Sequence, residues 1–568
     1  MSTVIIRIRR IICIGLTVLL ILNTRGMAQV KPEMDHASIM QILQAAGPGD
    51  TILFTAGTYR GNYRLENLHG EMNLPIVIKG IHSDVCIIDG ESEPGMSLKN
   101  NAFKLTDCSW INIESFTIRN CWTDLIVAEN SSWISLRSCS LYGGKRALFA
   151  TGRGSHHFLV ERSSWEQDER VWSHEGDYSW DEVHHGIHRH YNGSLFQGSG
   201  ISGNFVLRDN LIRNTFNAFR LSQINDGALD LLACTNGEIY RNTIHNTSDN
   251  VLEPEVHVRN LHFYHNTMVN GHAFISITEV KGGPMYVYGN TALSLPDSED
   301  GWTIFKISCE RDSLTLPFYI FNNSWQVDFD MIGSPRHLWE NSHIRHFNNA
   351  CFSEASDTFG IYNIGFDNHF DFDCSNVPFP DLLLSAGHEK HGLVADPLFR
   401  DPGANDFRLK DGSPCIDRGK KDDVIHAWEG KRPDIGAYEG EQRIEGLPFR
   451  YMEPEEIVPY HELPRLTRMK VNDKEVQLWF SLPMNASSLE EAGFSIANGA
   501  MELPLELPLD HKNLSKDGYL LRLSGKGLAE LNAVPQSQLN LKVKQWPRSQ
   551  SGQSLTSWAS EIDITLKR

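Results

Sequence analysis

Charged side chains of opposite sign occupy matching positions in two segments near the middle of the chain. Arg220 lies in segment 217–222, and Glu253 lies in the similar segment 250–255. If these segments form adjacent strands, about 4.8 Å apart, the two side chains are salt-bridge neighbours. Further titratable residues gather around this pair: Asp226, Asp230, Glu255, His257 and Lys281. This concentration favours a catalytic site, although a solvated ion pair on an exposed sheet would have the same signature.

One reaction that these residues can support is β-elimination on a uronate-containing polysaccharide. Arg220, aided by Lys281, would neutralise the substrate carboxylate, and a Ca²⁺ ion held by Glu253 and Glu255 could assist. His188 or Lys281 would act as the base that removes the C5 proton. The reaction requires no other cofactor.

A glycoside hydrolase is the alternative enzyme. It needs two carboxylates about 5 Å apart, or roughly 6.5–9.5 Å apart for inversion. Glu253 with Glu255, or Asp226 with Glu253, could supply that pair, and Asp230 lies close to Asp226 in sequence.

A long segment between Ser163 and Asn210 is rich in tryptophan and histidine. Insertions in a repeat protein usually fall on its binding face, and tryptophan rings stack on the C–H surfaces of sugars. The residues that we expect to contact the sugar chain are Trp172, Trp180, His184, His185, Asn217 and His257. Two other interpretations stay open. The tryptophans could form a small core under the loop, and the histidines His184, His185, His188 and His190 could bind a transition metal.

Short alternating strands that end in asparagine recur along the chain. The recurring residues are Asn210, Asn242, Asn266, Asn290, Asn323 and Asn349, separated by 32, 24, 24, 33 and 26 residues. A period near 24 with three short strands per turn predicts an all-β, right-handed parallel β-helix solenoid. Asparagine tolerates the left-handed bend between strands and can hydrogen-bond its copy on the next rung, so we expect this column to be structural.

Both ends of the predicted solenoid carry recognisable motifs. A short amphipathic helix over 38–46 precedes Pro48-Gly49-Asp50, and the chain later contains Asp396-Pro-Leu-Phe and Pro433-Asp-Ile-Gly-Ala-Tyr. This opening resembles β-helix polysaccharide lyases of the chondroitinase B and alginate lyase type, which implies a helix that plugs the first rung. The Asn-Gly-x-Glu-Thr-Ile-Arg segment of those lyases is absent, as are the Asn-Thr-Asp and Gly-His-Gly signatures of pectin hydrolases. The resemblance therefore implies a fold and transfers no site residue.

Composition divides the chain into four parts. Arg7, Arg9 and Arg10 precede an apolar run, and Gly26-Met27-Ala28 offers a cleavage site, so residues 1–28 are predicted to be a signal peptide. Residues 29–440 form the predicted β-helix, and 441–463, with Pro459, form a linker. Residues 464–568 resemble Ig-like modules of bacterial surface proteins, which implies a C-terminal β-sandwich. We expect a secreted, periplasmic or cell-surface protein without a later membrane span.

Net charge restricts the binding partners. A formal charge of −19 argues against nucleic acid, whose phosphates need a basic footprint. An anionic sugar chain would also be repelled at long range, so such a substrate needs a local basic cleft or a bridging cation. The ten cysteines leave an odd number beyond Cys13, which does not indicate a disulfide framework.

The favoured function, implied chiefly by the resemblance of the N-terminal opening, is a polysaccharide lyase acting on an acidic substrate, with a glycoside hydrolase as the first alternative. The third is a glycan-binding protein or adhesin without catalysis, in which the C-terminal module acts as a spacer. A mixture of Arg, Glu, His and Lys favours catalysis over simple binding. The sequence gives no indication of an oligomeric state.

Overall fold

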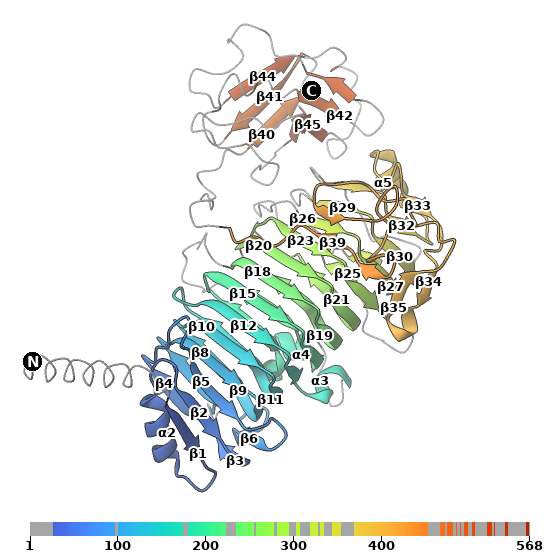
Figure 1. The fold of residues 1–568 in the computed structure, drawn as a ribbon. Coiled ribbons are helices and arrows are strands. Elements are labelled where there is room, and N and C mark those ends of the chain that lie inside the picture. The colour runs from blue at the N-terminus through green and yellow to red at the C-terminus, as the bar shows by residue number, and fades with distance from the viewer. Residues whose placement is uncertain are drawn as a thin grey trace, which may run out of the picture.

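The computed structural model describes residues 26–96, 100–173, 180–222, 234–254, 257–277, 281–294, 303–306, 318–327, 330–333, 344–353 and 368–452, together with short segments between 466 and 566. Its main body is a parallel β-helix that rises from the N-terminal strands in blue to the later rungs in yellow (Figure 1).

One face of the coil is a continuous parallel sheet, here called sheet A. Each strand pairs with its copy on the next rung, as β5 does with β8. In order, the strands of sheet A are β1 (Met27–Val30), β2 (Thr51–Phe54), β5 (Ile76–Gly80), β8 (Ser109–Glu114), β10 (Ser132–Arg137), β12 (His156–Glu161), β15 (Gly203–Arg208), β18 (Thr235–Tyr240), β20 (His257–Tyr264), β23 (Met285–Tyr288), β26 (Phe318–Phe321), β29 (Ile344–Phe347) and β31 (His369–Asp371).

The strands of the other two faces belong to one connected set, because some long strands bend and run along both faces. For example, β9 pairs with β6 through its first part and with β7 through its last part. These strands are β3 (Gly57–Arg60), β4 (Tyr63–Glu66), β6 (Cys86–Asp89), β7 (Phe103–Thr106), β9 (Thr117–Glu129), β11 (Ser140–Thr151), β13 (Ser164–Glu166), β14 (Ser194–Ser199), β16 (Leu211–Thr215), β17 (Phe219–Ser222), β19 (Thr243–Pro254), β21 (Thr267–Ser276), β24 (Thr291–Leu293), β25 (Thr303–Lys306), β27 (Ser324–Val327), β28 (Asp330–Gly333), β30 (Ala350–Ser353), β32 (Cys374–Ser375) and β33 (Leu393–Val394), with β22 (Lys281–Gly282) beside β20.

Alternation along each strand places the apolar side chains inside the coil. In β5, Ile76 and Ile78 are fully buried, whereas Val77 and Lys79 are partly exposed. Parallel register stacks Ile78 on Ile113 of the next rung. One apolar core therefore runs along the coil axis, as the two-residue period predicts.

The asparagine column is confirmed as a structural ladder. Asn242 donates through Nδ2 to Oδ1 of Asn266 (3.0 Å), and its backbone N–H donates to the same oxygen (3.0 Å). Asn266 repeats both bonds toward Asn290. We call this corner, which holds Asn210 and its equivalents, the ladder bend. Each side chain there replaces backbone hydrogen bonds that a turn cannot make.

A short helix lies near the first rung, and its role as the plug that the resemblance implied stays a prediction. Helix α2 (His36–Gln44) begins two residues earlier than expected, because Asp35 caps it by accepting a hydrogen bond from the Ser38 backbone N–H (2.7 Å). Its apolar side, with Ile39 and Leu43, is buried against the core.

The end of the coil turns back on itself. The last elements are α5 (Asp381–Ser385), β34 (Phe399–Asp401), η2 (Pro402–Ala404), β35 (Asp406–Leu409), β36 (Ile425–Ala427), β37 (Tyr438–Glu439), β38 (Gln442–Arg443) and β39 (Glu445–Gly446). Residues 419–452, here called the return strap, descend along the rungs. Its bonds are Asn348 Nδ2 to the Lys420 carbonyl (3.0 Å), Asn322 Nδ2 to Asp434 (2.8 Å), His265 Nε2 to Ile444 (2.8 Å), Asn260 Nδ2 to Arg450 (2.8 Å) and Asn236 Nδ2 to Met452 (3.0 Å). The beginning of the predicted linker thus lies against the coil.

The C-terminal region contains two small sheets. One consists of β44 (Leu520–Ser524), β41 (Glu475–Phe480), β40 (Leu466–Val471) and β46 (Ile564–Leu566), and the other of β43 (Glu502–Pro504), β42 (Phe494–Ala497) and β45 (Asn540–Val543). An Ig-like arrangement of these sheets stays a prediction. Among the described residues, no helix is long and apolar enough to cross a membrane. The predicted signal segment lies almost wholly outside these residues.

Candidate active site

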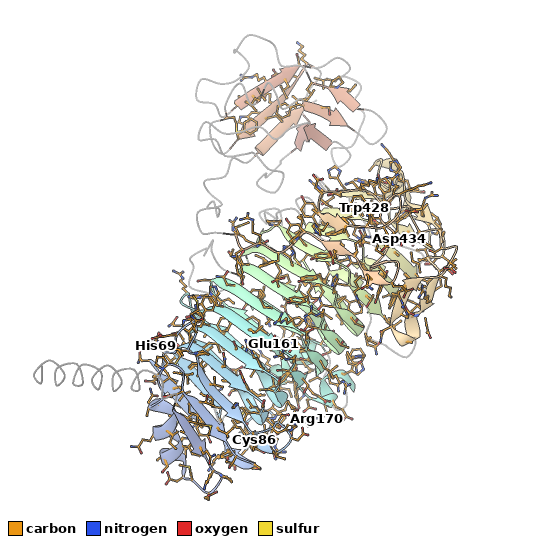
Figure 2. The ribbon with its side chains drawn as sticks, in the orientation of Figure 1. His69, Cys86, Glu161, Arg170, Trp428 and Asp434 are labelled. Carbon is orange, nitrogen blue, oxygen red and sulfur yellow. The ribbon has the colours of Figure 1, made fainter. Side chains whose placement is uncertain are left out.

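The tryptophan- and histidine-rich segment is an excursion inserted between β13 and β14. It contains α3 (Glu169–Ser173), α4 (Trp180–His184) and η1 (Arg189–Tyr191). Figure 2 labels Arg170, in α3, at the edge of the coil. We call the corner beneath it, which holds residues 216–218 and their equivalents on other rungs, the excursion bend.

A small apolar core fixes the excursion to this bend. Val171, Val183 and Tyr191 of the excursion pack on Trp122 and Phe216 of the coil. Trp180 packs at the edge of this core, and its indole N–H donates to Asp249 Oδ1 (2.9 Å). The interpretation of the tryptophans as a satellite core therefore holds for Trp180, which also positions the residues next to it.

Arg220 and Glu253 lie side by side on adjacent rungs, which confirms the predicted register. Arg220 pairs with Glu253 in the parallel ladder, and its Nη2 lies 3.2 Å from Glu253 Oε1. The Arg220 side chain is 22% exposed, whereas that of Glu253 is 3% exposed. The pair is therefore not the solvated surface pair that was the alternative. Asn192, at the end of the excursion, accepts a second hydrogen bond from Arg220 Nη1 (2.8 Å).

Lys145 is a lysine that the sequence reasoning missed, and it lies at the same bend. Burial, together with the positive charges of Arg146, Arg220 and Arg189 and against an opposing effect of Asp124, lowers the pKa of its ammonium to about 8. A lysine with this pKa is mostly protonated at neutral pH and becomes a neutral amine, able to accept a proton, as the pH rises through about 8.

Glycines make room for the backbone around Lys145. Gly143 has φ +68°, and a Cβ on Gly144 would lie 2.2 Å from Leu125. On the next rung, a Cβ on Gly193 would lie 1.5 Å from the Lys145 carbonyl oxygen. Any larger residue there would displace the strand. The Gly143-Gly144-Lys145-Arg146 run was thus the available sequence signal for this site.

Arg146 is held as firmly as Arg220. Its guanidinium makes a bidentate pair with Asp124 and donates through Nη1 to Gln197 Oε1 (3.1 Å). Gln197 lies beside Arg220 in the parallel register. Two guanidinium groups, each held by an ion pair, therefore lie near enough to Lys145 for their charges to lower its pKa.

His184 joins this group from the excursion. It stacks on Trp180, with ring centroids 4.5 Å apart. Burial lowers its pKa, with a further lowering by His185, Arg220 and Lys306 and an opposing effect of Asp249. These interactions place His184 near the Arg220 pair, as expected for a residue at the site.

The other predicted residues are distributed as follows. His185 is exposed and its Nδ1 lies 3.3 Å from Asp181, His188 precedes η1, and Trp172 lies in α3. Asn217 is fully buried and accepts a hydrogen bond from the Asn250 backbone N–H (2.9 Å). The substrate contact that we expected of Asn217 stays a prediction.

Several predicted residues fall outside the structural description. Asp226, Asp230 and Glu255 lie outside the described residues. The strands of His257 and Lys281 pair with each other, but only their backbones are described. Within the described part of the chain, no group of three or more His, Cys, Asp or Glu residues is arranged to hold a metal ion. The expected Ca²⁺ site includes Glu255 and therefore stays a prediction.

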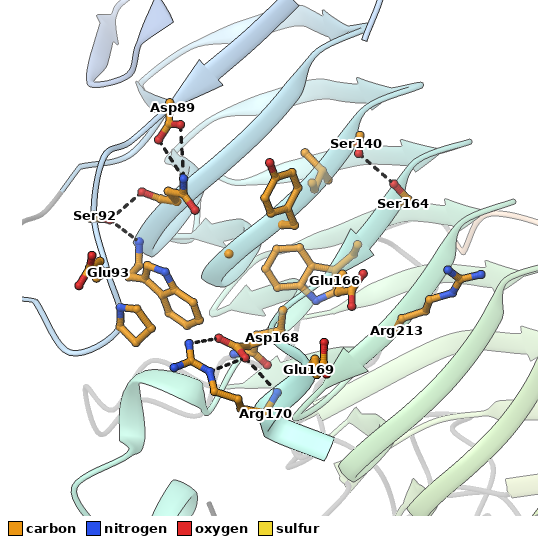
Figure 3. A pocket seen from close by; sticks show the side chains of 18 of the residues that line it. Asp89, Ser92, Glu93, Ser140, Ser164, Glu166, Asp168, Glu169, Arg170 and Arg213 are labelled. Carbon is orange, nitrogen blue, oxygen red and sulfur yellow. Dashed lines mark hydrogen bonds and ion pairs between the residues drawn. The ribbon is translucent and has the colours of Figure 1, made fainter. Parts of the chain in front are cut away.

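A cleft of about 910 Å³ opens on the other side of the excursion (Figure 3). Its walls come from β9, β11, β13, β16 and the start of the excursion. Charged residues that line it are Asp89, Glu91, Glu93, Glu166, Asp168, Glu169, Arg170 and Arg213. We call it the acidic cleft.

Comparisons with known proteins give structural likeness at low identity. No protein-family model and no curated protein matches the chain. Pectate lyase Pel9A is 14% identical over 74% of this chain and 97% of its own, with a TM-score of 0.42. The PL6 family alginate lyase AlyGC is 13% identical over 79% of this chain and 62% of its own, with a TM-score of 0.40. The Family 28 exopolygalacturonase of Yersinia enterocolitica is 11% identical over 56% and 78%, with a TM-score of 0.33.

Proposed function

We propose that the protein is an exported polysaccharide lyase that cleaves a uronate-containing chain by β-elimination at the excursion bend. The observation that carries this proposal is Lys145, a partly buried lysine of lowered pKa among the arginines Arg146, Arg189 and Arg220. A base next to fixed cations is the combination that removal of a proton beside a carboxylate requires.

In the proposed reaction, the arginines bind the substrate before the lysine removes a proton from it. Arg220 and Arg146 bind the uronate carboxylate and stabilise the negative charge that develops on it. The neutral amine of Lys145 takes the C5 proton. The electron pair of that C–H bond forms the C4–C5 double bond, and the C4–O4 bond breaks. The departing oxygen takes a proton from water, and Lys145 later returns its own proton to solvent.

Glu253 and Asp124 would act as positioning residues. Each holds one arginine in place through an ion pair. Since the Glu253 side chain is almost fully buried, it is poorly placed to reach a sugar. This assignment differs from the hydrolase alternative, in which Glu253 is one of two reacting carboxylates.

The test is digestion of a panel of acidic polysaccharides with the purified full-length protein. The unsaturated uronate formed by β-elimination absorbs ultraviolet light, so rising absorbance is expected and Lys145→Met should prevent it. The rate should rise with pH to a plateau above about 8, the pKa of Lys145. New reducing ends without that absorbance would indicate hydrolysis and contradict the lyase proposal.

The signal segment and the C-terminal region complete the proposal. Export through residues 1–28 would bring the enzyme to polymers outside the cytoplasm. The Ig-like module would act as a spacer or binding unit. Detection of the mature protein outside the cytoplasm, with a new N-terminus near Ala28, tests the export step.

A further inference from the structure

We infer that the substrate is a heteropolymer in which the uronate is linked to an uncharged or amino sugar, and that the acidic cleft binds this second sugar. The inference rests on the proposed function, because it takes the cationic side of the excursion bend as the place where the uronate binds. The supporting observation is a difference in charge between the cationic side, near Lys145, and the neighbouring acidic cleft.

The cationic side accepts a carboxylate. Five basic side chains interact there, against three carboxylates: Lys145, Arg146, Arg189, Arg220 and Lys306 against Asp124, Asp249 and Glu253. The local excess of positive charge attracts an anionic sugar although the whole protein is acidic.

The cleft side has the opposite character. Three of its carboxylates have cationic partners, because Asp89 pairs with Arg119 (2.6 Å), Glu91 with Arg60 (3.1 Å) and Asp168 with Arg170. Glu93, Glu166 and Glu169 have no ion pair among the described residues. Glu166 accepts a hydrogen bond from Asn214 (2.9 Å) and pairs in the parallel register with Arg213, another lining residue, so the carboxylates of the cleft still outnumber its cations but Glu166 has a basic neighbour. All three are exposed around a hollow lined in part by Trp122 and Tyr142 (Figure 3).

One strand connects the two sides. Tyr142 and Gly143 line the cleft, and Lys145 follows two residues later on β11. At about 3.3 Å per residue, some 7 Å of strand separates Gly143 from Lys145, which is within the length of two sugar units. Gln167, another lining residue, donates to the Lys145 carbonyl (3.3 Å). Gln167 also donates to the Tyr191 carbonyl (2.7 Å), and both side chains are buried, so a sugar chain bound at Lys145 would reach the cleft over the surface of the excursion.

Charge then selects the neighbouring sugar. A homopolymer of uronate would place a second carboxylate beside Glu93, Glu166 and Glu169, and two like charges about 4 Å apart repel each other even at the surface. A hexose or N-acetylhexosamine brings hydroxyl and amide groups, which can donate hydrogen bonds to these carboxylates. A free amino sugar would also be attracted as a cation.

The experiment compares two kinds of polymer at one ionic strength. The probes are hyaluronan and unsulfated chondroitin, in which uronate alternates with N-acetylhexosamine, and polygalacturonate and polymannuronate, which are uronate throughout. Initial elimination rates are measured for the wild type and for the triple variant Glu93→Gln/Glu166→Gln/Glu169→Gln. Binding of the same polymers to Lys145→Met is measured in parallel by titration calorimetry. The control variant Glu33→Gln/Glu71→Gln/Glu445→Gln removes the same charge at exposed positions outside the cleft.

We expect the wild type to prefer an alternating polymer by about tenfold or more, and the triple variant to reduce this ratio severalfold by accepting the uronate homopolymers. The control variant should keep the wild-type ratio. Equal rates on both kinds of polymer, unchanged in the triple variant, would overturn the inference and leave the lyase proposal intact. Selective binding without any elimination would overturn the lyase proposal and support the cleft assignment. Absence of both cleavage and selective binding would overturn both.

Discussion

The two bends of the coil use asparagine in different ways. At the ladder bend, Asn242 and Asn266 use their amide oxygens and nitrogens in bonds to the next rungs. At the excursion bend, Asn217 bonds to the Asn250 backbone, but Nδ2 of Asn217 and both amide atoms of Asn250 have no hydrogen-bond partner among the described residues. Nε of Arg220 is buried and similarly unpaired.

This difference distinguishes the ladder bend, which supports the fold, from the excursion bend, which holds the candidate site. The ladder satisfies its own polar groups and repeats along the coil, so it stabilises a bend and leaves nothing for a ligand. The excursion bend retains buried polar groups with unused capacity, beside charged residues that are held by ion pairs. Buried groups of this kind are costly in a fold and are typical of binding and catalytic sites.

Substitution of the proposed base, at the excursion bend, should have the largest effect of all, and this effect should be on the elimination rate and not on folding. Lys145→Met is expected to lower the elimination rate by about 10³-fold or more, in the range that a general base contributes. The coil should stay folded, since methionine fits a partly buried lysine stem. Rates from ultraviolet absorbance, with circular dichroism as the folding check, measure this. Wild-type turnover in Lys145→Met would remove Lys145 from the mechanism.

Arg220 should affect both turnover and stability. Arg220→Ala leaves the Glu253 carboxylate buried without its ion-pair partner, and loss of one member of a buried pair costs about 3 kcal/mol of unfolding free energy. In Arg220→Met/Glu253→Gln, which removes both charges, we expect stability to recover while activity does not. Denaturant titration and initial rates follow the two effects. Recovery of activity in the double variant would assign Arg220 a purely structural role.

At the ladder bend only stability should change. Asn266→Leu leaves the Asn242 amide and backbone N–H without their acceptor, so we expect a loss of about 3 kcal/mol. Activity per folded molecule should equal that of the wild type. Asn217→Leu should cost less, about 1 kcal/mol, because its Nδ2 has no partner to lose among the described residues. Equal costs for the two variants would contradict the contrast between the bends.

The last prediction concerns the pH dependence of stability. The pKa of Lys145 is about 8 in the folded protein against an ordinary 10.5, so the unfolded chain binds more protons between these values. The contribution of Lys145 to the free energy of unfolding should therefore rise with pH across that window. Below pH 8, Lys145→Met should be more stable than the wild type, and the gain should disappear toward pH 10.5. Thermal unfolding midpoints of both proteins across pH 7–10.5 test this. Parallel curves for the two proteins would show that the lysine is not desolvated.

The fold was predictable because it is periodic. The asparagine spacing and the two-residue alternation repeat many times, so local errors average out, and the register that pairs Arg220 with Glu253 follows from it. The position of the helix near the N-terminus was predicted to within two residues.

The site was less predictable because it depends on contacts between rungs that are not adjacent in sequence. Lys145, Arg146 and Asp124 meet Arg220 only after the coil has stacked and the excursion has folded back over the bend. Burial of Glu253 and Asn217 could not be read from alternation, since that pattern distinguishes inside from outside and does not show which outside positions a long insertion covers. The Gly143-Gly144 pair was the visible local signal of a bend near the proposed base.

The contacts of the return strap determine which rungs would first bear a pulling force applied to the C-terminal region. The strap bonds through Arg450 and Met452 to Asn260 and Asn236, near the middle rungs, so tension applied from the C-terminal region reaches the coil there. The last rungs would be bypassed until those contacts give way. Because the strap crosses the rungs, its hydrogen bonds would break one after another, as in peeling, while the parallel ladders beneath keep their register.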